Sequence, residues 1–135
     1  MNTAREIARE EILLDGMIDA VHMAVVDWHV KQQHPSASDA EIQNETLETI
    51  RSLVGDGLVK TGYRGEDGNF VPESLEQSMQ ELRESYVAHY DEPGEWMWSC
   101  WLELTEKGKQ FAVSTAKGHQ LARRENERKS LPSND

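Results

Sequence analysis

The feature that most constrains the fold is the spacing of the apolar residues, which recur three and four positions apart in several segments. In the first segment, steps of four, three, four and three residues connect Leu14, Ile18, Val21, Val25 and Trp28. This spacing places the side chains on one face of a helix, where they can meet a core. It predicts one long helix over residues 3–33 with Trp28 in the core, and Gly16 allows a kink within this helix. His34-Pro35 ends it, because the residue before a proline avoids helical dihedral angles.

Two further helices begin at capping boxes, in which a serine and the Glu or Gln three residues later satisfy backbone amides of the first turn. Ser38 and Glu41 predict the start of a second helix. Gly55-Asp56-Gly57 predicts its end, because glycine accepts the left-handed conformation of a helix terminus. Ser74 and Gln77 predict the start of a third helix in the same way.

Two segments between these helices are typical of strands. Residues 58–63 form a short run of strand composition, and residues 96–104 alternate between two faces. One face carries Trp96, Trp98, Cys100, Leu102 and Leu104, and the other carries Met97, Ser99, Trp101 and Glu103. Because neighbouring strands usually pair, we predict a two-stranded antiparallel ribbon with the third helix inserted between its strands. A last helix is expected after Thr105.

These elements predict an α+β fold that is mainly helical, with a single domain over residues 1–121. A chain of 135 residues suits one hydrophobic core. Residues 122–135 are too polar to bury, and we expect them to form a disordered tail.

The outer face of the tryptophan strand leaves two alternatives open. If the inserted helix covers this face, Met97 and Trp101 are packing residues. If the face is open, they are exposed side chains of the kind that is enriched at protein interfaces. Both residues are therefore candidates for binding a partner.

Charge is distributed unevenly along the chain, whose net charge is −11. Residues 1–104 contain 7 Lys/Arg and 21 Asp/Glu, a net charge of −14, whereas residues 105–135 contain 7 and 4, a net charge of +3. An acidic body repels the phosphate backbone of nucleic acids and attracts basic partners, although acidity can also serve solubility alone. The single cysteine, the lack of a signal-peptide pattern and the lack of a long apolar run predict a cytoplasmic protein without a membrane span.

Two motifs carry a family resemblance. The first is Thr49-Ile50-Arg51-Ser52-Leu53-Val54-Gly55-Asp56-Gly57-Leu58-Val59, and the second is Leu104-Thr105-Glu106-Lys107-Gly108-Lys109-Gln110-Phe111. Over about residues 38–113 they resemble the wing region of winged-helix domains of MarR- and PadR-type regulators. The first motif resembles the family's recognition helix and the first wing strand that follows it. The second motif resembles the second wing strand and the closing helix. The family has three helices before its wing, whereas the apolar spacing here predicts two.

The resemblance implies a winged-helix-like topology, transcriptional regulation and homodimers that pair through terminal helices, here the first helix. The DNA-binding residues would then be Lys60, Arg64, Lys107 and Lys109.

The charge of the second helix opposes a DNA-reading role. A recognition helix contacts phosphates and base edges through Arg, Lys, Asn or Gln, yet residues 39–54 hold four Asp/Glu and one Arg. We therefore expect a non-enzymatic, acidic interaction or regulatory module, as an antitoxin or immunity protein would be. Its basic protein partner would contact Glu41, Glu45, Glu48, Met97 and Trp101. A DNA-binding regulator is the alternative.

Other candidate groups favour neither a cofactor nor catalysis. Asp19 and His22 are three residues apart and could share an ion with His89, but the second Glu-x-x-His of a helical carboxylate site is missing. Cys100 lies among tryptophans and is expected to be buried and unreactive. We expect no metal, no cofactor and no enzymatic activity.

Overall fold

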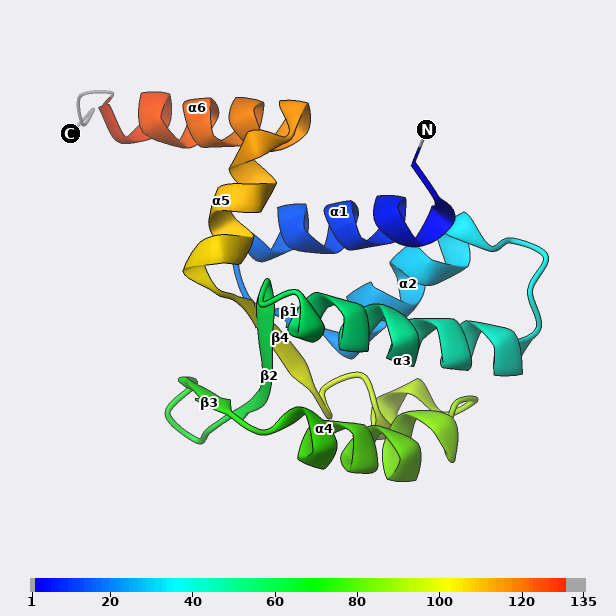
Figure 1. Cartoon of the computed structure of the whole chain (residues 1–135). Helices are drawn as coiled ribbons and strands as arrows, with labels where there is room; N and C mark the ends of the chain where they lie inside the picture. The colour runs from blue at the N-terminus through cyan, green and yellow to red at the C-terminus, as the bar shows by residue number, and fades with distance from the viewer. Residues whose placement is uncertain (1, 131–135) are drawn as a thin grey trace.

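A computed structural model describes residues 2–130, which form six α-helices and four strands (Figure 1). The helices are α1 (Ala4–Gly16), α2 (Met23–Gln33), α3 (Asp39–Gly55), α4 (Leu75–Leu82), α5 (Glu106–Ser114) and α6 (Ala116–Ser130). The strands are β1 (Val21–His22), β2 (Val59–Arg64), β3 (Phe70–Pro72) and β4 (Trp101–Leu104). A π-helical turn, Arg83–Val87, follows α4, and a 3-10 turn, Pro93–Glu95, precedes β4. The prediction of a mainly helical α+β fold is confirmed.

The predicted helix starts at the serines and at Thr105 are confirmed. The Ser38 hydroxyl accepts a hydrogen bond from the Glu41 amide at 3.2 Å, and the Glu41 carboxylate accepts one from the Ser38 amide at 3.1 Å, which completes the capping box of α3. Ser74 caps α4 and Thr105 caps α5 through the same type of side-chain bond. Each cap satisfies an amide that the first helical turn leaves unpaired.

The prediction of one long helix over residues 3–33 is wrong. The chain leaves the helix after Gly16, runs through four residues and pairs Val21–His22 with β4 before α2 begins. A side chain at Gly16 would overlap Leu104, so the glycine allows α1 to end tightly against the sheet. The apolar spacing is therefore interrupted. Trp28, predicted in the core, is 55 % exposed.

The sheet has four antiparallel strands in the order β1-β4-β2-β3, not the predicted two. The predicted pairing of the 58–63 and 96–104 segments is present as β2 with β4, in the register Thr61 opposite Leu102. Two short strands, β1 and β3, add to the edges. Each has only two or three residues, too few to produce a periodic pattern in the sequence.

The predicted strand over residues 96–104 is shorter than expected. Only Trp101–Leu104 is a strand, because Asp91-Glu92-Pro93-Gly94 starts a series of turns that continues through Trp96 and Ser99. Cys100, Leu102 and Leu104 face inward as predicted. Trp98, predicted on the same face, is 55 % exposed, whereas Trp96 is only 3 % exposed.

The core lies between the inner face of the sheet and the four helices α1, α2, α3 and α4. In Figure 1, α1 and α3 lie across the sheet on one side and α4 lies below α3. The segment from β3 to the 3-10 turn, residues 70–95, is inserted between the two central strands. We call this segment the insert.

A buried polar cluster anchors the insert to the helical layer. The Tyr86 hydroxyl, on a fully buried side chain, donates to the Asp27 carboxylate of α2 at 2.6 Å and lies 3.1 Å from the Thr46 hydroxyl of α3. Tyr90 also donates to Asp27, at 2.9 Å, and the Lys31 ammonium pairs with the same carboxylate at 2.9 Å. Because the polar groups of this cluster are partners of one another, their hydrogen bonds offset the cost of burying them.

The C-terminal helices α5 and α6 follow the sheet. In Figure 1, α6 extends away from the body of the molecule. The sequence predicts a disordered tail from residue 122, whereas α6 is helical up to Ser130. The rest of the predicted tail, residues 131–135, lies outside the described residues.

Candidate interaction surface

The alternation of the strands creates an outer sheet face that carries aromatic side chains. Leu102 and Thr61 point into the core, so their neighbours Trp101, His22 and Arg64 point to the other side. Trp98, from the turn before β4, lies against them. We call these four residues, His22, Arg64, Trp98 and Trp101, the aromatic face.

The rings of the aromatic face form a stack. Trp98 and Trp101 are nearly parallel, with ring centroids 5.6 Å apart and an angle of 21° between the planes. The His22 ring is 4.5 Å from Trp98 and 5.5 Å from Trp101. Trp101 and His22 are half-buried, whereas Trp98 is 55 % exposed. Trp98 is thus the solvent-facing end of the stack.

The Arg64 side chain, from the end of β2, lies against the Trp101 ring of the stack. Its guanidinium carbon lies 4.4 Å from the centre of the Trp101 ring, which is cation–π geometry. The same guanidinium donates to the Asp19 carboxylate at 2.6 Å, and the Ala20 amide donates to that carboxylate at 2.7 Å. These hydrogen bonds, first the one from the Ala20 amide, lower the pKa of Asp19. A guanidinium held by both an indole ring and a carboxylate is therefore part of this surface.

His22 is held in its neutral form by the stack. Burial among the tryptophans lowers its pKa from the ordinary value of 6.5, and a hydrogen bond with the Met97 backbone offsets part of this shift. Its Nδ1 atom is buried without a hydrogen-bond partner. His22 therefore acts as an aromatic ring at neutral pH.

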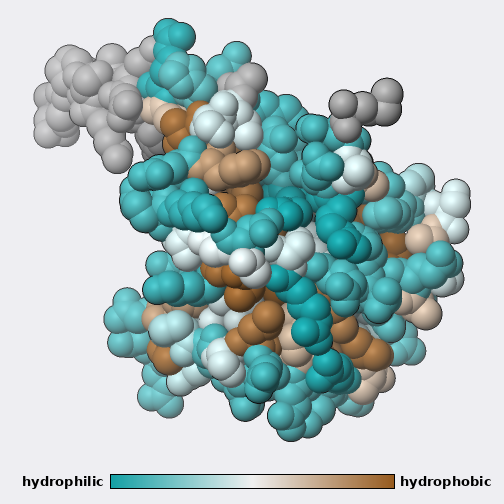
Figure 2. Space-filling view, viewed as in Figure 1, coloured by the Kyte–Doolittle hydropathy of each residue, from teal (hydrophilic) through white to brown (hydrophobic). Residues whose placement is uncertain are grey.

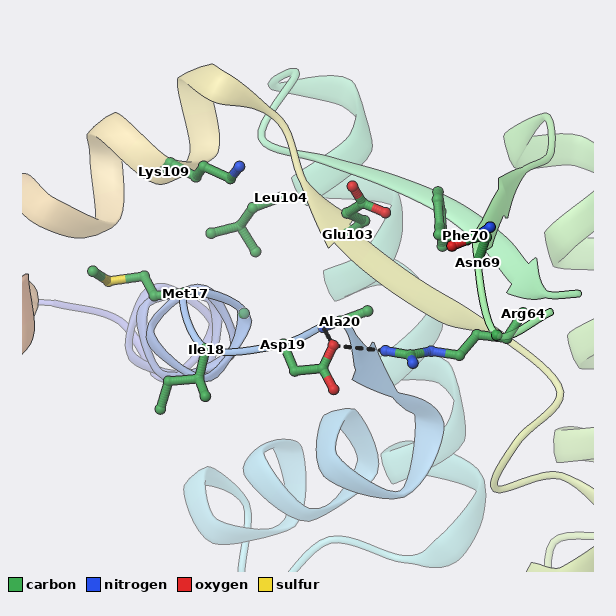
Figure 3. Close-up of a pocket in the computed structure, with 12 residues that line it drawn as sticks. Met17, Ile18, Asp19, Ala20, Arg64, Asn69, Phe70, Glu103, Leu104 and Lys109 are labelled. Carbon is green, nitrogen blue, oxygen red and sulfur yellow. Dashed lines mark hydrogen bonds and ion pairs between the residues drawn. The ribbon is translucent and has the colours of Figure 1, made fainter. Parts of the chain in front are cut away.

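A cleft adjoins the aromatic face, with a volume of about 340 Å³ (Figure 3). Its walls come from the α1–β1 link, the β2–β3 hairpin, β4 and the start of α5, as Figure 3 shows. The Asp19–Arg64 ion pair crosses its floor, and Glu103 and Lys109 line its walls. The lining contains both signs of charge, so the cleft has no strong preference for anions or cations.

The predicted acidic site on α3 does not form one open patch. Glu41 is used by the capping box. Glu45 accepts two hydrogen bonds from the Arg5 guanidinium, both at 2.8 Å, and these lower its pKa. Glu48 lies 3.8 Å from Arg51 and keeps 46 % of its side chain exposed. Two of the three carboxylates therefore stabilise the fold.

The other predicted partner-binding residues, Met97 and Trp101, are both half-buried. Met97 packs against the core, and Trp101 is covered by Trp98 and Arg64. The exposed tryptophan is Trp98, which the alternation assigned to the inner face. Pro93-Gly94 is the signal that could have found it, because this dipeptide favours a turn and breaks the strand period.

The predicted DNA-binding residues are only partly brought together. Lys60 and Arg64 share the outer side of β2, and Lys109 lines the cleft with Arg64. Lys107 is separate, because its ammonium donates to the Asp56 carbonyl at 2.7 Å and so caps the end of α3. Lys60 lies opposite Glu103 in the β2–β4 register.

The residues that were considered as metal ligands have other partners. Among residues 2–130, no group of three His, Cys, Asp or Glu side chains is placed to hold an ion. Asp19 binds Arg64, His22 stacks on the tryptophans, and His89 lies 3.4 Å from Glu92. Cys100 is buried as predicted, at 1 % exposure, and burial raises the pKa of its thiol to about 12.

The insert carries carboxylates that the described ion pairs leave unneutralised. Neither Glu73 nor Glu81 takes part in a described salt bridge. Burial raises the pKa of Glu73, and the neighbouring Glu81 carboxylate raises it further. Two like charges in contact oppose ionisation, so a cation placed beside them would be bound favourably.

A separate apolar surface lies at the junction of α1 and α2. Ile18 is 77 % exposed and Trp28 is 55 % exposed.

A groove of about 360 Å³ between α1 and α6 is lined by Glu11, Leu14, Asp15 and Ile18 on one side and by Lys117, Gln120, Leu121 and Arg124 on the other. Figure 2 shows apolar side chains over α5 and near the start of α6.

Comparison with protein-family models, with curated proteins and with solved structures finds no significant match to this chain. Among the described residues, no helix combines the length and the hydropathy that a membrane span requires.

Proposed function

We propose that this protein is a non-enzymatic interaction module that binds and regulates a basic protein partner. The observation that carries the proposal is the set of insert carboxylates that take part in no described ion pair, Glu73, Glu76, Glu81 and Glu84. Glu76 and Glu84 are exposed on the same helical segment. Complementary charge steers a basic partner to such a surface and suppresses acidic competitors.

We propose that the module has a winged-helix-like arrangement. The chain order is helix, strand, helix, helix, strand and, after the insert, strand. Three helices precede β2, which brings the chain closer to the MarR- and PadR-type pattern than the predicted two helices do. The strands β1, β4 and β2 lie side by side in this order, so the returning strand β4 lies between β1 and β2, as the winged-helix arrangement requires.

In this arrangement α3 stands at the position of the recognition helix, and its charge argues against reading DNA. Its exposed or half-buried carboxylates are Asp39, Glu41, Glu45 and Glu48, against Arg51 alone. The insert also packs on this helix through the Tyr86–Thr46 contact. A protein partner is therefore the better-supported ligand.

Charge reversal on the insert tests this function. Affinity for the native partner, captured from the source cell on the full-length protein, is measured by titration for wild type and for Glu76→Lys/Glu84→Lys. We expect the reversed variant to bind at least about tenfold more weakly, with a loss that shrinks as salt screens the charges. Glu6→Lys/Glu10→Lys on α1 is the matched control. Equal affinity in all three proteins would contradict the proposal.

A DNA-binding regulator is the second candidate, and one observation favours it. Lys60 and Arg64 lie on the outer side of β2, and Lys109 lines the cleft beside Arg64, in a molecule with a net charge of −11. Specific binding to genomic fragments that falls steeply with salt would support this function. The loss of that binding in Lys60→Ala/Lys109→Ala would locate it.

We also propose that two copies pair through the α1–α2 junction and α6. The α1 side of the groove is acidic and the α6 side is basic, as in the intramolecular Lys117–Glu11 ion pair at 2.9 Å. Such a surface is complementary to a second copy of itself, which suits a twofold dimer. Burial of Ile18 and Trp28, both more than half exposed, would supply the apolar contact.

A further inference from the structure

Trp98 is the most exposed residue of the aromatic stack. It is 55 % exposed, although its ring contacts Trp101 and His22. Trp96, in contrast, is 3 % exposed and its indole nitrogen donates to the Tyr90 carbonyl. The Trp98 end of the stack therefore leaves indole surface open to solvent.

Arg64 shows what kind of group the stack accepts. Its guanidinium lies on the Trp101 ring at 4.4 Å and is held in place by the Asp19 carboxylate at 2.6 Å. The chain thus fills one end of the stack with its own arginine. A planar cation is attracted to the face of an indole ring, and a nearby carboxylate fixes its orientation.

The sequence that leads to Trp98 is acidic. Residues 84–106 contain six Asp/Glu and no Lys or Arg. Asp91, Glu92 and Glu95 are exposed in the turns directly before Trp98, where Glu92 lies 3.4 Å from His89. An anionic ligand, such as the phosphate backbone of a single-stranded nucleic acid, would be repelled by these three carboxylates.

We infer that the outer end of the Trp98–Trp101 stack is the binding site for an arginine side chain of the basic partner. The guanidinium stacks on the exposed Trp98 ring, and the carboxylates of the preceding turns pair with it, as Asp19 does with Arg64. This inference rests on the proposed function, because it names the group that a basic protein presents and the residue that receives it.

The test uses the full-length protein and a blocked peptide of three Arg-Gly-Gly repeats. Two comparison peptides replace the arginines. Lysine keeps the positive charge, and citrulline keeps the shape of the side chain but not its charge. Binding is followed by the amide and indole N–H signals in two-dimensional NMR. We expect the Trp98 indole signal to shift most with the arginine peptide, less with lysine and not at all with citrulline.

Trp98→Ala is compared with Phe111→Ala, because Phe111 is also an exposed aromatic residue, at 46 %, and lies on α5 outside the aromatic face. We expect Trp98→Ala to weaken the arginine peptide about two- to fivefold, the range of one exposed cation–π contact. Phe111→Ala should leave the affinity unchanged, and Trp98→Phe should retain most of it. The amide spectra of the variants check that each is folded.

The outcomes separate the two proposals. If the arginine peptide binds and Trp98→Ala and Phe111→Ala bind it equally, the arginine site is wrong and the basic-partner function stands. If neither cationic peptide binds at millimolar concentration, the arginine site is also wrong, and the titration of the native partner with Glu76→Lys/Glu84→Lys decides the basic-partner function. If a single-stranded oligonucleotide binds at Trp98 more tightly than the arginine peptide does, the charge argument for this face is wrong.

Discussion

Single residues decide how the insert is attached. The Tyr86 hydroxyl connects α2 and α3 to the insert through Asp27 and Thr46, in a site that excludes water. The sequence places Asp27 in the first predicted helix and Tyr86 after the start of the third. It cannot predict their contact, because the two residues are 59 positions apart and meet only after the chain has turned back.

We predict that Tyr86→Phe lowers the free energy of unfolding by about 1–3 kcal/mol, because it leaves a buried carboxylate with one donor fewer. Chemical denaturation monitored by circular dichroism measures this change. Tyr63→Phe is the control, since Tyr63 is 44 % exposed, and its effect should stay within about 0.5 kcal/mol. A loss as small for Tyr86→Phe would show that the hydroxyl is dispensable.

His22 gives the stability of the molecule a dependence on pH. Its pKa in the folded protein is below the ordinary value of 6.5, so the unfolded chain takes up a proton first as the pH falls. Stability therefore decreases as the pH drops below about 6.5, down to the folded pKa. We predict that His22→Phe reduces this decrease. Denaturation curves at pH 7.5, 6.5 and 5.5 measure it, and an unchanged slope would contradict the assignment.

At the scale of elements, capping residues predict the starts of helices correctly, whereas the apolar spacing over a long segment does not predict where a helix ends. The capping residues Ser38, Ser74 and Thr105 were predicted because a helix start depends only on the next three residues. The break after Gly16 was missed because the apolar spacing of α1 and α2 happens to match across it. The need for glycine there comes from Leu104, which is distant in sequence.

Two glycines in helices should respond oppositely to alanine. A Cβ at Gly108 would overlap the Leu58 carbonyl, which is backbone and cannot move aside. We predict that Gly108→Ala costs about 1–3 kcal/mol. At Gly55 no atom lies within 4 Å of a Cβ, so Gly55→Ala should stabilise the protein by about 0.5 kcal/mol. Thermal unfolding of both variants measures the contrast, and the same sign for both would refute this packing.

At the scale of the whole molecule, the sequence shows that charge is distributed unevenly, but it does not show which carboxylates stabilise the fold and which have no ion-pair partner. The sequence located acidic residues on α3 and predicted a partner site there. In the structure Glu41 and Glu45 serve the fold, and the unneutralised carboxylates lie on the insert. Which carboxylates remain without cations depends on tertiary ion pairs such as Arg5–Glu45, which connect residues 40 positions apart.

The apolar junction of α1 and α2 predicts the oligomeric state. We expect sedimentation equilibrium to give a dimer, and Ile18→Glu to give a monomer, because it places a charge in the paired surface. Ile18 is 77 % exposed within one copy, so the variant should lose only the stability that dimerisation supplies, and its unfolding temperature should approach that of the wild type as the wild type is diluted. A wild-type protein that is monomeric at high concentration would rule out this pairing.

The most direct test of the central claim is affinity capture on the full-length protein from its native cell, with bound protein and bound DNA both identified and quantified. The account predicts one stoichiometric protein with a basic surface, whose binding weakens in Glu76→Lys/Glu84→Lys and not in Lys60→Ala/Lys109→Ala. Enriched DNA would contradict the account. If this DNA is lost in Lys60→Ala/Lys109→Ala and retained in Glu76→Lys/Glu84→Lys, the outer side of the sheet is a nucleic-acid surface.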